Sequence, residues 1–271
     1  MATNYQAQID EIMSRVAEIK KGLPPQPESK RTPGKLSFKR NAADQIERAL
    51  REDGHRIWGF VIYRCTYASD EDWDLCMRHL YKEVRESMDF YNGHDLLDEE
   101  CFRLTVIEDK SKFDGASTST VRKHFQEWCA QALHREQGSE AEIGSRRQKP
   151  VPWFGSLAVR YRFCLQIDAA SLKSIVNNED EPWVNLINND HVMAAQPCND
   201  TSTKATVDED NVGEFADDED EEYPPLEGNR EQDVGWMQVY TGTLMPTFYS
   251  YLWDPNAWVV SYCRPPYVLS V

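Results

Sequence analysis

The segment from Ile57 to Arg64, with the sequence IWGFVIYR, most constrains the fold of this chain. Residues at alternate positions of a strand point to opposite faces of a sheet. Both sets are apolar here, with Trp58, Phe60 and Ile62 on one face and Ile57, Val61 and Tyr63 on the other. A strand of this kind needs cover on both faces. The segment therefore predicts a central strand with other elements packed above and below it.

Helices and strands alternate along the rest of the chain. Apolar residues at helical spacing predict helices over residues 5–21, 41–52, 70–84, 118–135 and 168–176, and a short one near residue 246. Apolar runs and alternation predict strands over residues 57–64, 102–107, 159–167, 183–187, 235–244 and 258–263. In the 159–167 strand, one face is polar and carries Arg160, Arg162, Cys164 and Gln166.

This order favours an α+β fold with an open sheet and helices packed on it, and a ferredoxin-like arrangement is the specific expectation. A doubly wound α/β sheet is the alternative. Residues 1–35 are predicted to be an amphipathic helix followed by a basic, proline-rich linker. Residues 36–271 are predicted to be a single domain, interrupted at about residues 190–234 by an acidic, disordered insertion. The 271 residues are 40% hydrophobic, which is ample for one large core.

The negative charge is concentrated in that insertion. Residues 200–233 include fourteen acidic side chains and only two basic ones, in a chain whose formal net charge is −16. This composition is typical of a solvated spacer, and binding of a basic partner by the acidic run at 217–222 is the alternative. The chain has no large cluster of lysine and arginine, so we expect no binding to nucleic acid.

No short motif indicates a cofactor, a metal or a catalytic group. The chain lacks GxxxxGK[ST], GxSxG and HExxH, and no GxGxxG follows a strand. The seven cysteines include no CxxC pair, which favours buried, reduced thiols. Residues 208–219 resemble an EF-hand loop, but Val212 stands where a ligand oxygen is needed. We therefore predict no catalytic residue, no metal site and no cofactor.

Arg64 is the strongest candidate for a functional residue. It ends the central strand on the same face as Ile62, at the carboxyl end where ligands gather in open α/β sheets. An arginine in this position can anchor a carboxylate or a phosphate. The acidic residues at 70–72, which begin the next helix, favour an internal ion pair instead, because buried arginines are normally paired.

Other charged and aromatic residues stand near strand ends or on polar faces and could share one pocket with Arg64. The predicted ligand-binding set is Arg64, Tyr63, Tyr67, Arg160 and Arg162, with Arg103, Arg264, Glu108 and Asp109 as neighbours. Surface salt bridges explain the same residues equally well.

The chain shows no pattern of a signal peptide and no run of about 18 apolar residues that could cross a membrane. We therefore expect a cytoplasmic protein, with the nucleus as the alternative compartment. The N-terminal helix or the acidic insertion would contact a protein partner. A second copy of the chain is a further candidate partner.

The residues from Trp58 to Tyr67, followed by Asp72 and Trp73, resemble a group of uncharacterised filamentous-fungal proteins. Those proteins have a WGFVIYRxTY-type strand followed by an acidic helix that contains tryptophan. The Gly-Trp-Met segment at 235–237 and the ending at 258–266 are also similar. The resemblance implies a fungal source, and it implies no activity and no catalytic residue.

These observations favour a non-catalytic protein-interaction domain. The alternative is a small-molecule enzyme or ligand carrier that binds an anion near Arg64. A calcium-responsive regulator ranks third, because it depends on one imperfect loop.

Overall fold

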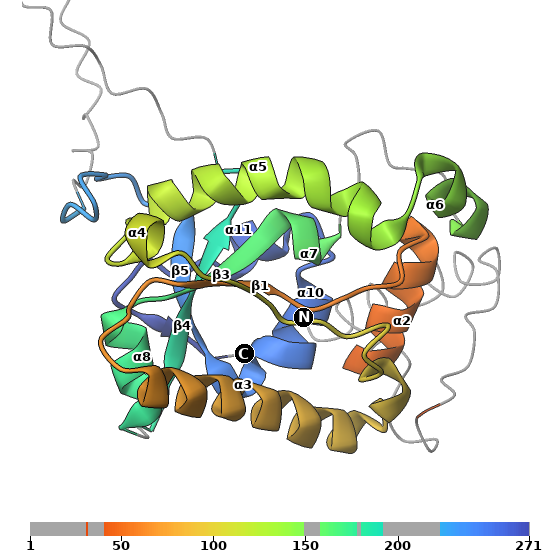
Figure 1. Ribbon diagram of the computed structural model, residues 1–271, viewed down its shortest axis with the longest axis horizontal. Helices are drawn as coiled ribbons and strands as arrows, with labels where there is room; N and C mark the ends of the chain where they lie inside the picture. Colours follow the sequence, from red (N-terminus) through yellow and green to blue (C-terminus); the bar gives the residue numbers. More distant parts are fainter. Residues whose placement is uncertain (1–30, 32–40, 149–157, 178–179, 192–222, 271) are drawn as a thin grey trace, which may run out of the picture.

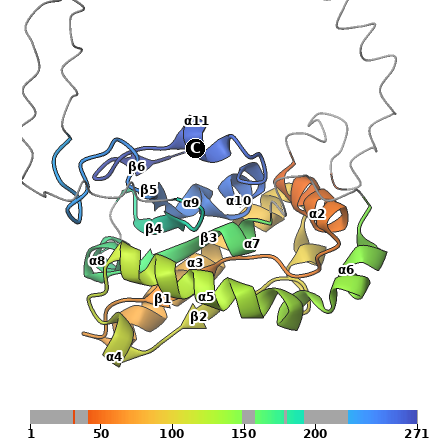
Figure 2. The same ribbon diagram turned by 90° about the horizontal axis from the view of Figure 1, so that it is seen from above.

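The computed structural model describes residues 31, 41–148, 158–177, 180–191 and 223–270 (Figures 1 and 2). The predicted helix at 5–21, the proline-rich linker and the stretch that resembles a calcium loop lie outside these residues, apart from Arg31. In chain order the strands are β1 (Val61–Arg64), β2 (Thr105–Ile107), β3 (Phe163–Ile167), β4 (Trp183–Asn188), β5 (Trp236–Tyr240) and β6 (Val268–Leu269).

The helices surround these strands in the sequence. The longer ones are α2 (Ala42–Asp53), α3 (Asp70–Tyr91), α5 (Thr118–Gln137), α6 (Glu140–Arg146) and α8 (Ala169–Val176). The short ones are η2 (His94–Leu96), α4 (Lys110–Phe113), α7 (Val159–Arg162), α9 (Thr241–Thr243), η3 (Leu244–Phe248), α10 (Tyr249–Tyr251) and α11 (Ala257–Ser261).

All six strands form one mixed sheet in the order β2-β1-β3-β4-β5-β6. The predicted α+β class, with helices packed on an open sheet, is confirmed. Strand β1 pairs in parallel with both β2 and β3, whereas β4 is antiparallel to β3 and β5. A ferredoxin-like sheet has no parallel pairs, so the connectivity differs from that arrangement. The reason is that long helical crossovers join β1 to β2 and β2 to β3.

The two faces of β1 meet different helices, as its sequence predicts. Ile62 lies in a large apolar cluster that includes Leu80 from α3, while Tyr63 lies in a smaller cluster that includes Phe125 from α5. Figure 1 shows α5 and α3 on opposite sides of the sheet. The large cluster also contains Val239 of β5, so the segment after residue 223 completes the core that the first strand begins.

Capping residues define the ends of the helices beside β1. The Asn41 side chain accepts a hydrogen bond from the N–H of Asp44 at the start of α2, and Gly54 ends this helix with a φ of 72°. Ser69 accepts from the N–H of Asp72 and caps the start of α3, close to the predicted beginning of this helix at residue 70. β1 is therefore joined to α3 through a short connection that ends in an N-cap.

The prediction of a strand over residues 159–167 is wrong at two points. Its first four residues form the helical turn α7, which carries Arg160 inward to the carboxylate of Glu136. One helical turn followed by a strand produces an apolar pattern that resembles alternation. The strand that remains, β3, is buried along its whole length, so the predicted polar face is absent and Gln166 bonds to the carbonyl of Ala116 instead.

The strand predicted from Trp258 to Cys263 is a helix. Residues Ala257–Ser261 form α11, and the N–H of Tyr262 donates to the carbonyl of Trp258 over 2.7 Å. Trp258 is buried, but Val259 is 79% exposed, so the β-branched residues that favour a strand do not face the core. The edge beside β5 is occupied by β6 instead.

Residues 223–234 fall within the predicted acidic insertion, yet they pack on the domain. The carboxylate of Glu227 accepts hydrogen bonds from the N–H and the hydroxyl of Thr118 at the start of α5. The carboxylate of Asp233 accepts one from Trp258 over 2.7 Å. Composition alone could not separate these acids from the rest of the run, because their partners lie far away in the sequence.

Among the described residues, none of the helices has both the length and the apolar character that a bilayer crossing requires.

Candidate functional site

Arg64 lies at the carboxyl end of β1 and is enclosed by its own chain. Its guanidinium forms an ion pair with Asp70 at 2.5 Å and donates to the carbonyl of Thr66 at 3.1 Å. It also lies over the rings of Tyr67 and Trp73, at 4.5 and 5.0 Å from their centroids. The Arg64 side chain is only 6% exposed. The internal partner that the sequence suggests is therefore present, and it occupies the group that would anchor an anion.

Tyr63 points to the opposite face of the sheet from Arg64. Its ring packs among Phe113 and Phe125, and its hydroxyl lies 2.8 Å from Nδ1 of His124. Burial raises the pKa of the Tyr63 hydroxyl above its usual range. Tyr63 and Arg64 therefore cannot contact one ligand, because the sheet lies between them.

Arg160 lies at the other end of β1 and is the centre of a buried polar cluster. Two of its nitrogens donate to the carboxylate of Glu136 at 2.8 and 2.7 Å. The third nitrogen, Nη1, donates to the carbonyls of Gly59 and Arg103, and Nη2 also donates to the hydroxyl of Thr105. Burial by itself would raise the pKa of Glu136, but the hydrogen bonds and charge of Arg160 outweigh it and lower that pKa. Every donor direction of Arg160 is used within the fold.

Arg162 lies at a third position, apart from Arg64 and Arg160. Its side chain bonds to Asp190 at 3.2 Å and to the carbonyl of Leu252 at 3.3 Å, and it lies over the ring of Phe163. Of the five residues predicted to bind a ligand, the structure brings only Arg64 and Tyr67 into contact. The five do not line one pocket.

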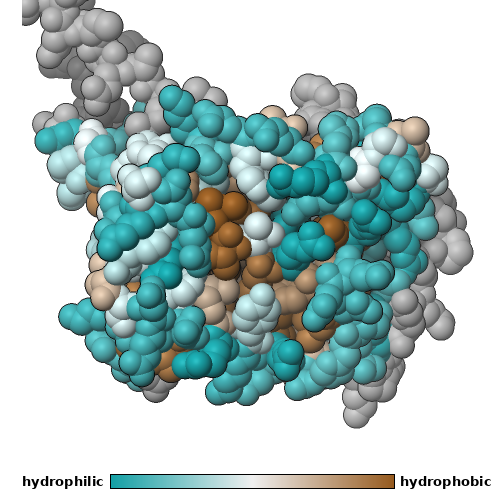
Figure 3. Space-filling model, viewed as in Figure 1, coloured by the Kyte–Doolittle hydropathy of each residue, from teal (hydrophilic) through white to brown (hydrophobic). Residues whose placement is uncertain are grey.

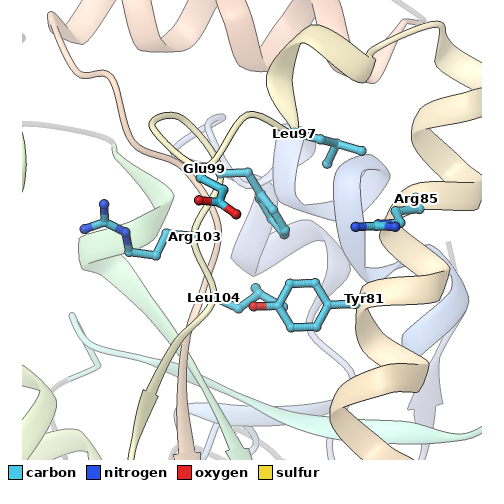
Figure 4. Close-up of a pocket in the computed structure, with 7 residues that line it drawn as sticks. Tyr81, Arg85, Leu97, Glu99, Arg103 and Leu104 are labelled. Atoms are coloured by element: carbon cyan, nitrogen blue, oxygen red, sulfur yellow. The ribbon is translucent and has the colours of Figure 1, made fainter.

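An open pocket lies instead between α3 and the segment that leads into β2 (Figure 4). We call it the α3–β2 groove, and its volume is about 550 Å³. Its lining residues are Tyr81, Arg85, Leu97, Glu99, Phe102, Arg103 and Leu104. A second pocket of about 630 Å³ adjoins it across Arg103 and is lined by Arg56, Ile57, Asp95, Asp98, Glu100 and Cys101 as well.

Trp58 supports the wall of the α3–β2 groove. The main-chain N–H of Trp58 donates to the carbonyl of Cys101, and its indole N–H donates to that of Leu96, both over 2.8 Å. The ring of Phe102 packs between Trp58, at 4.7 Å, and Tyr81 of α3, at 6.3 Å. A buried tryptophan with both of its N–H groups bonded therefore holds the groove wall in place.

The rim of the groove carries charged side chains of both signs. The side chains of Arg85, Glu99 and Arg103 are exposed, and within the described ranges none of them makes a hydrogen bond or an ion pair. Figure 4 shows Arg85 and Arg103 on opposite sides of the groove, with Glu99 between them. The groove thus combines aromatic walls with free charges of both signs.

The sequence names Arg103 among the neighbours of the predicted pocket, but it does not identify Tyr81, Arg85 or Glu99. A usable signal is the spacing of Tyr81 and Arg85, which are four residues apart and therefore share one face of α3. That face is polar, however, and a polar helix face ordinarily meets only solvent. Its position beside β2 depends on the sheet order, which the sequence does not reveal.

The described residues contain no group of three or more histidine, cysteine, aspartate or glutamate side chains that could hold a metal ion. Comparisons with protein-family models, with curated proteins and with solved structures found no match. The resemblance to filamentous-fungal proteins therefore remains an expectation from the sequence.

Proposed function

We propose that this chain is a non-catalytic protein-interaction domain that binds its partner at the α3–β2 groove. The main support for this proposal is that some arginine side chains are hydrogen-bonded within the fold and others are not. Arg64, Arg160 and Arg162 are all bonded within the fold, whereas Arg85 and Arg103 are exposed at a groove and unpaired in the described part of the chain.

The chemistry of the groove supports binding more than catalysis. Its lining contains no serine, cysteine or histidine, so it offers no usual nucleophile and no base that titrates near neutral pH. Tyrosine, phenylalanine and arginine are enriched where proteins bind one another. A fixed aromatic wall with charges at the rim has the features of such a surface. The predicted N-terminal helix and most of the acidic insertion predicted at about residues 190–234 lie outside the described residues.

Site-specific photocrosslinking tests this proposal. A benzoylphenylalanine at position 81, in the groove, is compared with one at position 90, where Phe90 is 72% exposed on the same helix. We expect a crosslinked partner in cells of the natural host from position 81 only. Equal crosslinking from both positions would contradict the proposal.

Charge reversal of the groove provides the second arm of this test. In the crosslinking chain, R85E/R103E should abolish the adduct, because it reverses both free positive charges. The matched control is K123E/R135E, which makes the same change at exposed positions of α5. An adduct that survives R85E/R103E as well as it survives the control would assign the crosslink to a different surface.

A further inference from the structure

No described segment pairs with the main chain of β2 on the side away from β1. Within the described residues, β2 is the last strand at its end of the sheet, and β1 is its only partner. Main-chain groups that a strand does not use in its sheet can pair with another strand, which is the usual hazard of a sheet edge. Proteins that recognise extended peptides use such an edge, together with pockets for alternate side chains.

The register identifies which groups are free. The N–H groups of Arg103 and Thr105 donate inward, to the carbonyls of Trp58 and Phe60. Because hydrogen bonding alternates along a strand, the N–H and C=O of Leu104 and Val106 point outward, away from β1. A partner strand could therefore bond to both residues without disturbing the sheet.

The same edge is apolar and partly exposed. Val106 and Ile107 are only partly buried, and they pack against the clusters on opposite faces of the sheet. In Figure 3, which has the view of Figure 1, apolar patches gather between the hydrophilic bands over α5 and α3, with some polar residues among them. Alternate side chains of an added strand would enter the α3–β2 groove on one face and reach Ile107 on the other.

The charges at the groove indicate which kind of segment could bind there. The chain has a formal net charge of −16, yet the charged residues that line this groove are two arginines and one glutamate; the carboxylates of Asp95, Asp98 and Glu100 line the adjoining pocket. Arginine forms paired hydrogen bonds with carboxylates. A second copy of the chain is a poorer occupant, because its β2 edge would bring a second Arg85 and Arg103 toward the first two.

We propose that the groove receives an extended segment of a partner protein, which pairs with β2 as an additional strand and places an acidic side chain between Arg85 and Arg103. This inference rests on the proposed protein-binding function. It adds to that function the conformation of the bound segment and the sign of its charge.

Peptides selected on the intact chain provide the probe. Linear twelve-residue peptides are selected from a phage-displayed random library, synthesised with a fluorescent label and measured by anisotropy. We expect the selected peptides to share an acidic residue and to lose affinity about tenfold or more with R85E/R103E, but not with K123E/R135E. Selected peptides that lack an acidic residue and bind R85E/R103E normally would overturn both the inference and the proposed function.

The strand pairing is tested by removing hydrogen-bond donors on each side. V106P deletes an N–H that the sheet does not use, and proline is tolerated in edge strands with its nitrogen toward solvent. We expect the V106P chain to keep the melting temperature of the unmodified chain and to bind the peptide about tenfold more weakly. N-methylation of the peptide, one amide at a time, tests the intact chain and should weaken binding at every second position.

The outcomes separate the two proposals. Peptides that depend on Arg85 and Arg103 but tolerate V106P and N-methylation at every position would refute strand pairing and leave the protein-binding function standing. If V106P changed only self-association in sedimentation, the occupant would be a second copy and the inference would be wrong. The same holds if peptides bound only after deletion of residues 208–222, since the chain's own acidic run would then be the occupant.

Discussion

The arginine side chains on the two sides of the segment that leads into β2 differ in burial and in hydrogen bonding. On one side, Arg160 is 1% exposed and bonds to Glu136 and to the carbonyl of Arg103 itself. On the other side, the side chains of Arg103 and Arg85 are exposed at the rim of the α3–β2 groove. In this fold, therefore, the position of an arginine near a strand end does not by itself indicate a binding site, because Arg160 is fully engaged by internal acceptors.

Disrupting the buried ion pair of Arg160 and Glu136 should have the largest effect on stability. E136Q keeps the size of the side chain but leaves the Arg160 charge uncompensated, and we expect it to lower the free energy of unfolding by about 3–5 kcal/mol. Urea denaturation followed by circular dichroism measures this loss. The control is the double variant E136L/R160M, which removes both charges and should cost less than E136Q. A cost for E136Q below about 1 kcal/mol would show that the pair behaves like a surface salt bridge.

His55 should make stability depend on pH. Burial, with smaller contributions from Arg147 and Arg146, lowers its pKa from 6.5 to about 4. Between these values the unfolded chain binds a proton that the folded chain does not, so stability falls as the pH drops from 6.5 toward 4. The slope due to His55 should approach 1.4 kcal/mol per pH unit. H55F should flatten the pH dependence in this window, and an unchanged slope would assign it to other groups.

Arg64 and Asp70 should differ in their contributions although they form one ion pair. The Asp70 side chain is 89% exposed, so D70N should cost less than about 1 kcal/mol. R64A also removes a buried stem and its contacts with Tyr67 and Trp73, and we expect a cost of about 2 kcal/mol with the fold retained. Differential scanning calorimetry distinguishes the two losses, and equal costs would contradict this explanation.

The alternative function, an anion bound near Arg64, has its own test. Native mass spectrometry of the intact chain would show a bound small molecule that R64A loses while it stays folded. That result would favour a ligand carrier over the protein-interaction domain.

The groove variants should have the smallest effect on stability. R85E/R103E changes exposed side chains that are unpaired in the described part of the chain, so its unfolding free energy should match that of K123E/R135E within about 0.5 kcal/mol. Thermal denaturation of both variants makes the comparison. A loss of more than about 2 kcal/mol for R85E/R103E alone would mean that the groove charges are structural.

Structural features that depend on residues close together in the sequence can be predicted from it. The two apolar faces of β1 and the N-caps Asn41 and Ser69 follow from spacing and local hydrogen bonding, and all are present. The α+β class follows from the order of helices and strands. Sheet order does not, because it depends on which strands pair across long crossovers.

The candidate site is less visible in the sequence for the same reason. Arg160 looks like an exposed residue on a polar strand face, but its partner Glu136 lies 24 residues away on α5. Tyr81 and Arg85 look like an ordinary solvated helix face until β2 is placed beside α3. The local pattern identifies charged residues, while only the fold decides which of them are already paired.

Hydrogen exchange at β2 tests whether this strand is an open edge that can receive a partner strand. The amide of Val106 faces outward, whereas those of its neighbours Thr105 and Ile107 face β1. In the intact chain, NMR should therefore show faster exchange for Val106 than for either neighbour, and a selected acidic peptide should slow it to their rate. If Val106 already exchanged as slowly as Thr105 and Ile107 in the free chain, or stayed fast with the peptide bound, β2 would not be an open edge that receives a partner strand.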